Sequence, residues 1–330
     1  MNWVIKENND NESVKRLSNE LNISPILSSM LVNRRIKTFD EAKKFFRPNF
    51  EMLHDPFLMK DMSLAVERIQ KAIQKNESIM IFGDYDVDGT SSVALLSMYL
   101  ESLGLKIIKY LPDRKKEGYG VSINAIDHAF SKNHKLIIAL DCGIKAHKQV
   151  EYAKEKGIEF IIWDHHNPDK NLPKALAILN PKRKDCAYPF KELCGCGVGF
   201  KLVQAIESKQ SKDNQIINYL DLVALAIAAD VVPLTGENRV LSFIGLQIIN
   251  SNPRPGVHSL LKKNVKKEYT ISDLMYYVGP RINAAGRMKH ASLALELLIC
   301  NDINSVEKLA LEIEDLNTSR RDIEKDITSQ

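Results

Sequence analysis

The fold is decided by a stretch at residues 78–89, whose sequence is SIMIFGDYDVDG. Its first five residues form a short, mainly apolar run, as expected of a strand that is buried on both faces. Three aspartates then follow at alternate positions, Asp84, Asp86 and Asp88, before a glycine that permits a tight turn. A buried strand that ends abruptly in acidic residues predicts a ligand site at its carboxyl end.

Two further runs repeat this pattern. Residues 136–140 (LIIAL) lead into the sequence DCG, and residues 159–163 (EFIIW) lead into the sequence DHH. Segments with amphipathic helical spacing lie between the runs, at 92–103, 125–130 and 147–156. We therefore expect an α/β fold with a mainly parallel, doubly wound sheet and helices on both faces. The carboxyl ends of its strands should bring distant acidic residues together.

The acidic cluster at residues 84–88 has two interpretations. A single aspartate after a strand often caps a helix or forms a turn, which explains Asp84 alone as well as a ligand role does. Three crowded carboxylates, however, would repel one another without a cation to neutralise them. A metal site therefore explains Asp84, Asp86 and Asp88 together better than turn chemistry does.

The histidines at residues 165 and 166 bear on the identity of the metal. Imidazole nitrogens are good ligands for Mn, Fe or Zn, whereas a site made only of oxygens favours Mg or Ca. Neighbouring residues of an extended segment point to opposite sides, so we expect one histidine to bind the ion and the other to face the substrate. Mn and Mg both stay open, and histidine favours Mn.

Four acid-bearing segments resemble the successive motifs of the DHH phosphoesterases. They are DVDG at 86–89, DCG at 141–143, DHH at 164–166 and IAADVVPL at 227–234. Within that superfamily the chain is most similar to the RecJ single-strand-specific exonucleases, from near residue 50 to its end. This closer likeness rests on GDYDVDG at 83–89, Arg114 with EGYG at 117–120, LCGCGV at 193–198 and GPRINAAGR at 279–287.

The resemblance implies a centre with two Mn²⁺ or Mg²⁺ ions. The implied ligands of the principal ion are Asp88, Asp141, His165 and Asp230. Asp86 would hold the second ion, with Asp141 as the bridge between the two. His166 would polarise the scissile phosphate, and Asp84 would orient either a ligand or a water.

Three arginines are expected to contact phosphate, namely Arg114, Arg281 and Arg287. Guanidinium groups match phosphate oxygens bidentately, and the nearby glycines let the backbone approach closely. Asn283 lies between the last two, in a segment whose glycines and proline predict a loop. The resemblance implies that one or more of these residues holds the 5′-terminal phosphate. Tyr119 is expected to stack on a base.

Other features have simpler explanations. The spacing of Cys194-Gly195-Cys196 is not that of a zinc site, so we expect a turn before a helix that starts near Gly199. Five cysteines without an evident disulfide framework or signal peptide favour a cytoplasmic location. No apolar stretch is long enough to cross a membrane. A net charge of +4 neither requires nor excludes nucleic acid.

We expect four parts along the chain. Residues 1–50 form an N-terminal helical cap, with a short helix at 39–46, and residues 51–250 form the catalytic α/β core. Residues 251–303 form a smaller helical part that contains the GPRINAAGR loop. Residues 304–330 begin a long connecting helix. RecJ-like enzymes continue into DHH-associated and oligonucleotide-binding domains, which this sequence lacks, so we expect a truncated chain.

The resemblance implies a hydrolase, a metal-dependent 5′-to-3′ exonuclease that releases 5′ mononucleotides from single-stranded DNA in repair and recombination. Two alternatives stay open: a DHH phosphodiesterase of short oligonucleotides or small phosphate compounds, and a non-catalytic DNA-binding replication component. The intact set of metal-type residues favours an enzyme over the latter. A single-strand-binding protein and a helicase are candidate partners without a visible motif. The lack of a heptad seam favours a monomer.

Overall fold

The computed structural model describes residues 10–208 and 215–329, which form two compact units, Met1–Met52 and Leu53–Gln330. The first unit contains three helices around a small core that includes Leu17 and Leu31. They are α1 (Asn11–Leu21), α2 (Pro25–Asn33) and α3 (Phe39–Phe46), followed by the short helix η1 (Phe50–Met52). The helix predicted at 39–46 is therefore confirmed, and the first nine residues of the predicted cap lie outside the described residues.

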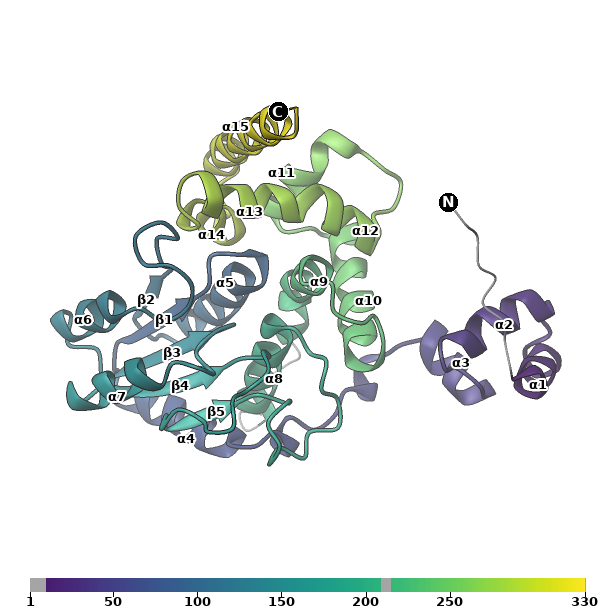
Figure 1. The fold of residues 1–330 in the computed structure, drawn as a ribbon, viewed down its shortest axis with the longest axis horizontal. Coiled ribbons are helices and arrows are strands. Elements are labelled where there is room, and N and C mark those ends of the chain that lie inside the picture. The colour runs from purple at the N-terminus through teal and green to yellow at the C-terminus, as the bar shows by residue number, and fades with distance from the viewer. Residues whose placement is uncertain (1–9, 209–214, 330) are drawn as a thin grey trace. The chain divides into compact units, whose positions relative to one another are not determined.

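The second unit is built on five parallel strands in the order β2-β1-β3-β4-β5 (Figure 1). Their bounds are β1 (Ile79–Gly83), β2 (Ile107–Tyr110), β3 (Leu136–Leu140), β4 (Glu159–Trp163) and β5 (Ala177–Leu179). The predicted fold class is confirmed. The chain runs outward from β1 to β2 and then returns to β3. The order reverses between β1 and β3, which is where ligands bind in such sheets.

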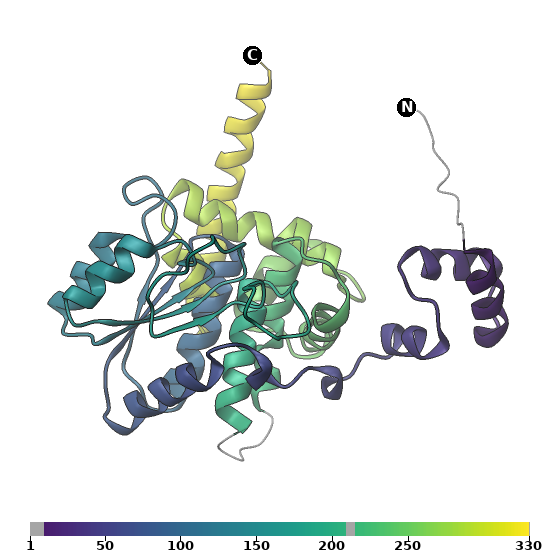
Figure 2. The ribbon, with the colours of Figure 1, turned by 60° about the horizontal axis from the view of Figure 1, so that its bottom comes forward.

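Helices cover both faces of this sheet, as predicted. On one face, α6 (Ile123–Ser131) and α7 (His147–Glu155) pack on strand residues that include Met80 and Phe160. The other face contacts α4 (Met62–Gln74), α5 (Val87–Ser102) and α8 (Gly195–Ser208). The sheet lies between these two sets of helices in Figure 2.

Two glycine-rich segments that were predicted as a turn and a loop are helical instead. Helix α8 begins at Gly195, not near Gly199, and the predicted GPRINAAGR loop is helix α13 (Gly279–Met288). These glycines provide space rather than flexibility. A β-carbon at Gly199 would overlap the Trp163 ring, and one at Gly286 would lie 2.7 Å from the carbonyl oxygen of Tyr85.

The rest of the second unit is helical. The short helix η2 (Pro56–Leu58) precedes the sheet, and the short helix η3 (Gln215–Tyr219) follows α8. The helices after η3 are α9 (Leu220–Ala229), α10 (Gly236–Ser251), α11 (Pro255–Leu261), η4 (Lys262–Asn264), α12 (Ile271–Asp273), the π-helix η5 (Leu274–Val278), α13, α14 (Ser292–Ile299) and α15 (Ile303–Thr328).

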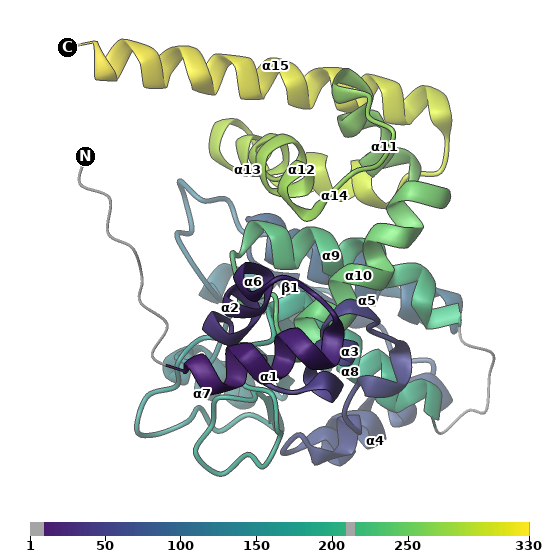
Figure 3. The same cartoon turned by 90° about the vertical axis from the view of Figure 1, so that its right-hand side faces the viewer.

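The long helix α15 runs across α11, α13 and α14 (Figure 3). It confirms the helix predicted from residue 304, whose final residue, Gln330, lies outside the described residues. The predicted boundaries near residues 250 and 303 stay predictions. Among the helices that the structure describes, none is both long and apolar enough to span a bilayer.

Candidate metal centre

The predicted metal-type side chains come from four elements. Asp84, Asp86 and Asp88 follow β1, and Asp141 follows β3. His165 follows β4. The fourth element is a helix, because Asp230 is the C-cap residue of α9. The sheet edge and the end of this buried helix together bring these side chains to one place.

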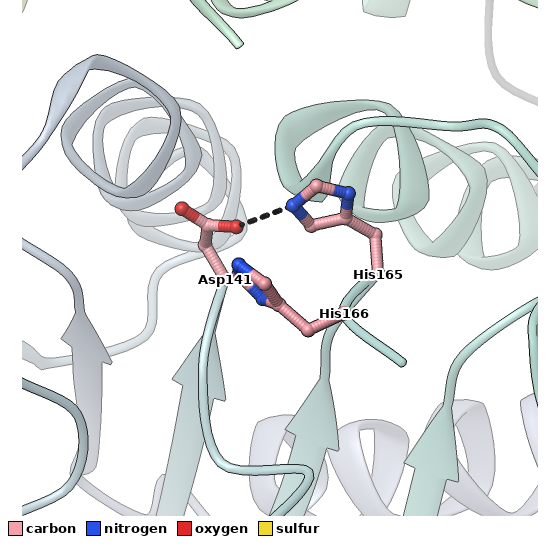
Figure 4. Close-up of side chains that lie close together, drawn as sticks. All are labelled: Asp141, His165 and His166. Atoms are coloured by element: carbon pink, nitrogen blue, oxygen red, sulfur yellow. Dashed lines mark ion pairs between the residues drawn. The ribbon is translucent and has the colours of Figure 1, made fainter. Parts of the chain in front are cut away.

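The His165 ring lies close to three of these carboxylates. Its Nε2 atom lies 3.2 Å from a carboxylate oxygen of Asp141, 3.8 Å from one of Asp88 and 3.7 Å from one of Asp230. Figure 4 shows the first of these contacts. These side chains form two groups of possible metal ligands. One group is Asp88, His165 and Asp230, and the other is Asp141, His165 and His166. Within each group, the ligand atoms lie within 4.8 Å of one another.

The donor set fits a cation. An oxygen of Asp84, an oxygen of Asp141 and Nδ1 of His165 are buried and have no hydrogen-bond partner among the described residues. Buried polar atoms are rarely left without a partner, and a bound ion is one reason for such exceptions. Mixed carboxylate and imidazole ligands suit Mn²⁺ and related divalent metals.

The carboxyl groups of this centre are strongly perturbed. Burial, together with the neighbouring Asp86, raises the pKa of Asp84 to about 7 and that of Asp88 to about 7. Burial and the charge of Asp88 raise the pKa of Asp230 to about 6, and the same causes raise that of Asp141 well above its usual value. A divalent cation would remove this repulsion and displace the protons.

We expected the two histidines to point to opposite sides of an extended segment, but they do not. Both rings face Asp141, and their centroids are 4.5 Å apart (Figure 4). The expectation was wrong because β4 ends at Trp163, so the histidines lie beyond the strand. Asp164 accepts a hydrogen bond from the backbone N–H of His166, two residues on, at 3.0 Å, which turns the chain.

Asp164 is a site residue that the sequence interpretation left without a role. It is buried, one carboxylate oxygen lies 2.7 Å from Nδ1 of His166, and the other accepts from the backbone N–H of Ile144 at 2.9 Å. The hydrogen bond between Asp164 and Nδ1 of His166 raises the pKa of His166 and fixes the direction of its ring. Its place in the DHH motif was the signal that could have identified it.

The start of α8 also belongs to the site, although the sequence interpretation gave it no role. The backbone N–H groups of Gly195 and Cys196 donate to the Asp88 carboxylate at 2.6 and 2.7 Å. A β-carbon at Gly195 would lie 2.6 Å from an oxygen of Asp141. The motif LCGCGV therefore positions two predicted ligands at once, one by hydrogen bonds and one by leaving space.

Asp86 has a local role in addition to the predicted one. One of its oxygens accepts from the backbone N–H of Gly89 at 2.9 Å, which makes Asp86 the N-cap of α5. That helix begins earlier than predicted, at Val87, because the acidic segment starts it. Asp86 is in neither of the two groups of possible ligands.

Aromatic residues and an arginine lie on the His166 side of the centre. The Arg114 guanidinium is 5.2 Å from the ring centroid of Tyr85, and the Tyr85 and Tyr119 centroids are 6.5 Å apart. The Tyr119 hydroxyl lies 3.5 Å from Nε2 of His166, and its side chain is exposed. A molecule that reaches His166 would therefore meet Tyr119.

The two arginines of α13 are in different settings. Arg287 is exposed, and it lines a pocket with Asn283. Arg281 is buried and donates to both carboxylate oxygens of Glu314 and to the carbonyl of Tyr277. Arg281 thus holds α13 to α15, and its predicted contact with phosphate stays a prediction.

Comparisons with known proteins place the chain in one family. The model of the DHH family, N-terminal domain, matches residues 78–227. The chain is 38% identical to the single-stranded-DNA-specific exonuclease RecJ of Bacillus subtilis, over 100% of this chain and 42% of that protein. It is 35% identical to the RecJ exonuclease of Escherichia coli, over 92% of this chain and 54% of that protein.

Solved structures of RecJ proteins are similar to this chain. A crystal structure of exonuclease RecJ bound to manganese superposes with a TM-score of 0.76 at 31% identity, over 84% of this chain and 69% of that one. A structure of RecJ in complex with Mg²⁺ from Thermus thermophilus superposes with a TM-score of 0.73 at 25% identity, over 96% of this chain and 42% of that one. The chain spans about half the length of the curated relatives it matches.

Proposed function

The chain belongs to the RecJ group of the DHH family, and on that basis we propose that it is a metal-dependent exonuclease acting on single-stranded DNA. It degrades the strand from the 5′ end and releases 5′ mononucleotides. The observation that carries this proposal is the convergence of Asp88, Asp141 and Asp230 on His165, from four separate elements.

The proposed cofactor is a pair of Mn²⁺ or Mg²⁺ ions. Asp88, Asp141, His165 and Asp230 would hold one ion, and Asp86 together with Asp141 would hold the other. When bound, such a pair supplies Lewis-acid chemistry that activates water and stabilises charge in an in-line phosphodiester displacement. Structures of RecJ relatives bound to manganese and to Mg²⁺ support this choice of metals.

The protein's own residues would orient and polarise the substrate. His166, held by Asp164, donates a hydrogen bond to an oxygen of the scissile phosphate; its raised pKa keeps the ring protonated over a wider pH range. Asp84, with one buried oxygen unpartnered, orients a metal ligand or the attacking water. These two residues are the proposed catalytic groups.

Recognition of the strand would come from the rim of the centre. Arg114, Arg287 and Asn283 contact phosphate, and the 5′-terminal phosphate held there sets the polarity of digestion. Tyr119 stacks on a base, a contact that unpaired bases can make easily. The exposure of Tyr119 next to His166 supports this role.

The cellular setting belongs to the same proposal. We infer a role in DNA repair and recombination, with a single-strand-binding protein and a helicase as candidate partners and a monomeric state. A cytoplasmic location is consistent with the five cysteines, which are all free thiols.

The test is digestion of end-labelled single-stranded DNA in Mn²⁺, with a duplex of the same sequence as the control substrate. We expect 5′ mononucleotides from the single strand and little from the duplex. Asp141→Ala should abolish the release, because Asp141 is the proposed bridge. Asp315→Ala, an exposed position on α15, is the matched control and should retain activity. Release from the 3′ end, or activity retained in Asp141→Ala, would contradict the proposal.

A further inference from the structure

The loop between β2 and α6, residues 111–122, carries two residues of the proposed function, Arg114 and Tyr119. The Arg114 side chain is exposed and makes no hydrogen bond or ion pair with a described residue. Its guanidinium lies 5.2 Å from the ring centroid of Tyr85. Because a surface loop can adopt many conformations, the position of Arg114 must be set by other contacts within the loop.

Glu117 joins the two ends of this loop. Its Oε2 atom accepts hydrogen bonds from the hydroxyl of Tyr110, the last residue of β2, at 2.8 Å and from the hydroxyl of Ser122, the N-cap of α6, at 2.6 Å. Its Oε1 atom accepts from the backbone N–H of Asp113 at 2.9 Å. The ends of the loop are therefore held together by one side chain of the loop itself, as in compact Ω-loops.

Glu117 also closes the turn that contains Arg114. The backbone N–H of Glu117 donates to the carbonyl of Asp113 at 2.8 Å, so these two residues are joined by a backbone bond as well as by the side-chain bond. The Asp113 carboxylate accepts from the backbone N–H groups of Lys115 and Lys116, at 2.9 and 3.2 Å. Arg114 therefore projects from a turn whose backbone is fixed on both sides.

The contacts of Glu117 lead to the buried core of the sheet. The Tyr110 ring stacks on that of Phe82, a fully buried residue of β1, with centroids 5.7 Å apart. Burial would raise the pKa of Glu117, but the hydrogen bonds from Ser122, Asp113 and Tyr110 outweigh it and lower this pKa. Glu117 is therefore a carboxylate at neutral pH, and hydrogen bonds to an ionised acceptor are stronger than those to a neutral one.

The segment that carries Tyr119 is held less firmly. Tyr119 lies between Gly118 and Gly120, whose φ angles are +80° and +81°, and a β-carbon at either glycine would meet nothing within 4 Å. Glycine adopts such angles without steric cost and restricts the backbone least. The Tyr119 ring can therefore adjust its position while Glu117 fixes that of Arg114.

We propose that Glu117 is a positioning residue for Arg114, and that it thereby sets how strongly the protein distinguishes a 5′-phosphoryl end from a 5′-hydroxyl end. Glu117 does not contact the substrate; it holds the turn from which the guanidinium reaches the phosphate. A guanidinium fork binds two phosphate oxygens only when its direction matches theirs, so a loosened turn loses this contact. The inference rests on the proposed function, because it takes Arg114 to contact the 5′-terminal phosphate.

The test measures binding of two oligodeoxythymidylates by fluorescence anisotropy in EDTA. Both are labelled at the 3′ end, and one begins with a 5′-phosphate and the other with a 5′-hydroxyl. Glu117→Gln keeps the shape of the side chain, but the amide can no longer accept all three hydrogen bonds. It should weaken binding of the phosphorylated strand about tenfold, the effect of losing one hydrogen bond to a charged group, and leave binding of the hydroxyl strand unchanged.

The matched control is Glu101→Gln. The Glu101 carboxylate pairs at 2.6 Å with Lys109, the strand residue before Tyr110, instead of with the loop. This variant should bind both strands like the wild type, because such partly exposed pairs contribute little. Tyr110→Phe removes one of the three bonds and keeps the ring on Phe82, so it should weaken binding of the phosphorylated strand by a smaller factor than Glu117→Gln.

A double variant shows whether Glu117 acts through Arg114. Arg114→Ala combined with Glu117→Gln should bind the phosphorylated strand no more weakly than Arg114→Ala alone, because both changes remove the same contact. Circular dichroism checks the fold of each variant, and unchanged binding of the hydroxyl strand checks it a second time.

Equal weakening for the two strands in Glu117→Gln would indicate a general structural role and overturn the inference. Additive effects in the double variant would also overturn it, as would a wild type that does not prefer the phosphorylated strand. The exonuclease proposal fails separately, since binding in EDTA needs no hydrolysis. A wild type that gives the expected binding pattern but releases no nucleotides in Mn²⁺ would retain the role of Glu117 and refute the exonuclease.

Discussion

Replacing Gly195 by alanine should damage the metal centre while leaving the fold intact. Gly195 is the first residue of α8, and its N–H donates to Asp88. A β-carbon there would lie 2.6 Å from an oxygen of Asp141 and 2.9 Å from its Cβ and Cγ. Asp141 must therefore move away from Gly195, which disturbs its present approach of 3.2 Å to His165.

The size of the effect follows from two opposing contributions. Alanine is favoured over glycine in a helix by about 1 kcal/mol, while overpacking a buried site costs about 1–3 kcal/mol. The net loss of stability without metal should thus be at most about 2 kcal/mol. Mutation of a residue that positions a metal ligand, as Gly195 positions Asp141, typically costs about 10–100-fold in metal affinity. This corresponds to about 1.4–2.7 kcal/mol less stabilisation by saturating Mn²⁺.

The assay is calorimetric titration with Mn²⁺, combined with thermal unfolding with and without the ion. The matched control is Gly197→Ala, two residues further along α8, where the nearest atoms to the added carbon belong to the side chains of Leu193 and Cys194, at 3.3 Å or more. Gly197→Ala should bind Mn²⁺ like the wild type. Wild-type Mn²⁺ affinity in Gly195→Ala would refute the idea that Gly195 reserves space for Asp141.

The remaining predictions concern charge. Without metal, thermal stability should fall as the pH rises from about 4 to about 7. The pKa of Asp84 and of Asp88 is raised from 3.8 to about 7, and that of Asp230 to about 6, so over this window these carboxyl groups hold protons in the folded state that the unfolded state has lost. Mn²⁺ should bind more tightly over the same rise in pH; unfolding curves in EDTA and Mn²⁺ titrations at both pH values check the two trends, and a flat profile would contradict them. Asp164→Asn should lower the pKa of His166 and shift the alkaline limb of the pH–rate profile to lower pH, an effect absent if His166 takes no part in the reaction. Arg281→Ala should destabilise the protein by up to about 3 kcal/mol, because it removes the buried partner of Glu314 and leaves only Lys263, at 3.7 Å. Arg287→Ala should raise KM at unchanged stability. Denaturant unfolding and steady-state kinetics separate the two, and similar stabilities for both variants would count against the structural role of Arg281.

The sheet and its functional edge were predictable because their signals are local. Buried parallel strands require continuous apolar runs, and β3 and β4 have the predicted bounds. The edge strands β2 and β5 were not predicted, because they lack such continuous apolar runs. The residues of β2 are only half-buried and β5 has three residues, so neither gives a long apolar run.

The glycines of α8 and α13 show where local reasoning fails. In sequence, a glycine-rich segment indicates a turn or loop. Here the missing side chains admit Trp163 against α8 and the backbone of Tyr85 against α13. Both partners lie far away along the chain, so only the packed structure shows that these glycines belong inside helices.

The sequence by itself determined the class of fold and the segments that carry the metal-type residues, since strand periodicity and ligand type are properties of short segments. The tertiary structure alone decided the direction of each side chain. His166 faces Asp141 because Asp164 holds its backbone, and Arg281 joins two helices through Glu314. Arg287, on the same helix as Arg281, is exposed beside the centre. Sequence neighbours do not determine such differences, because each depends on a partner that folding brings from a distant part of the chain.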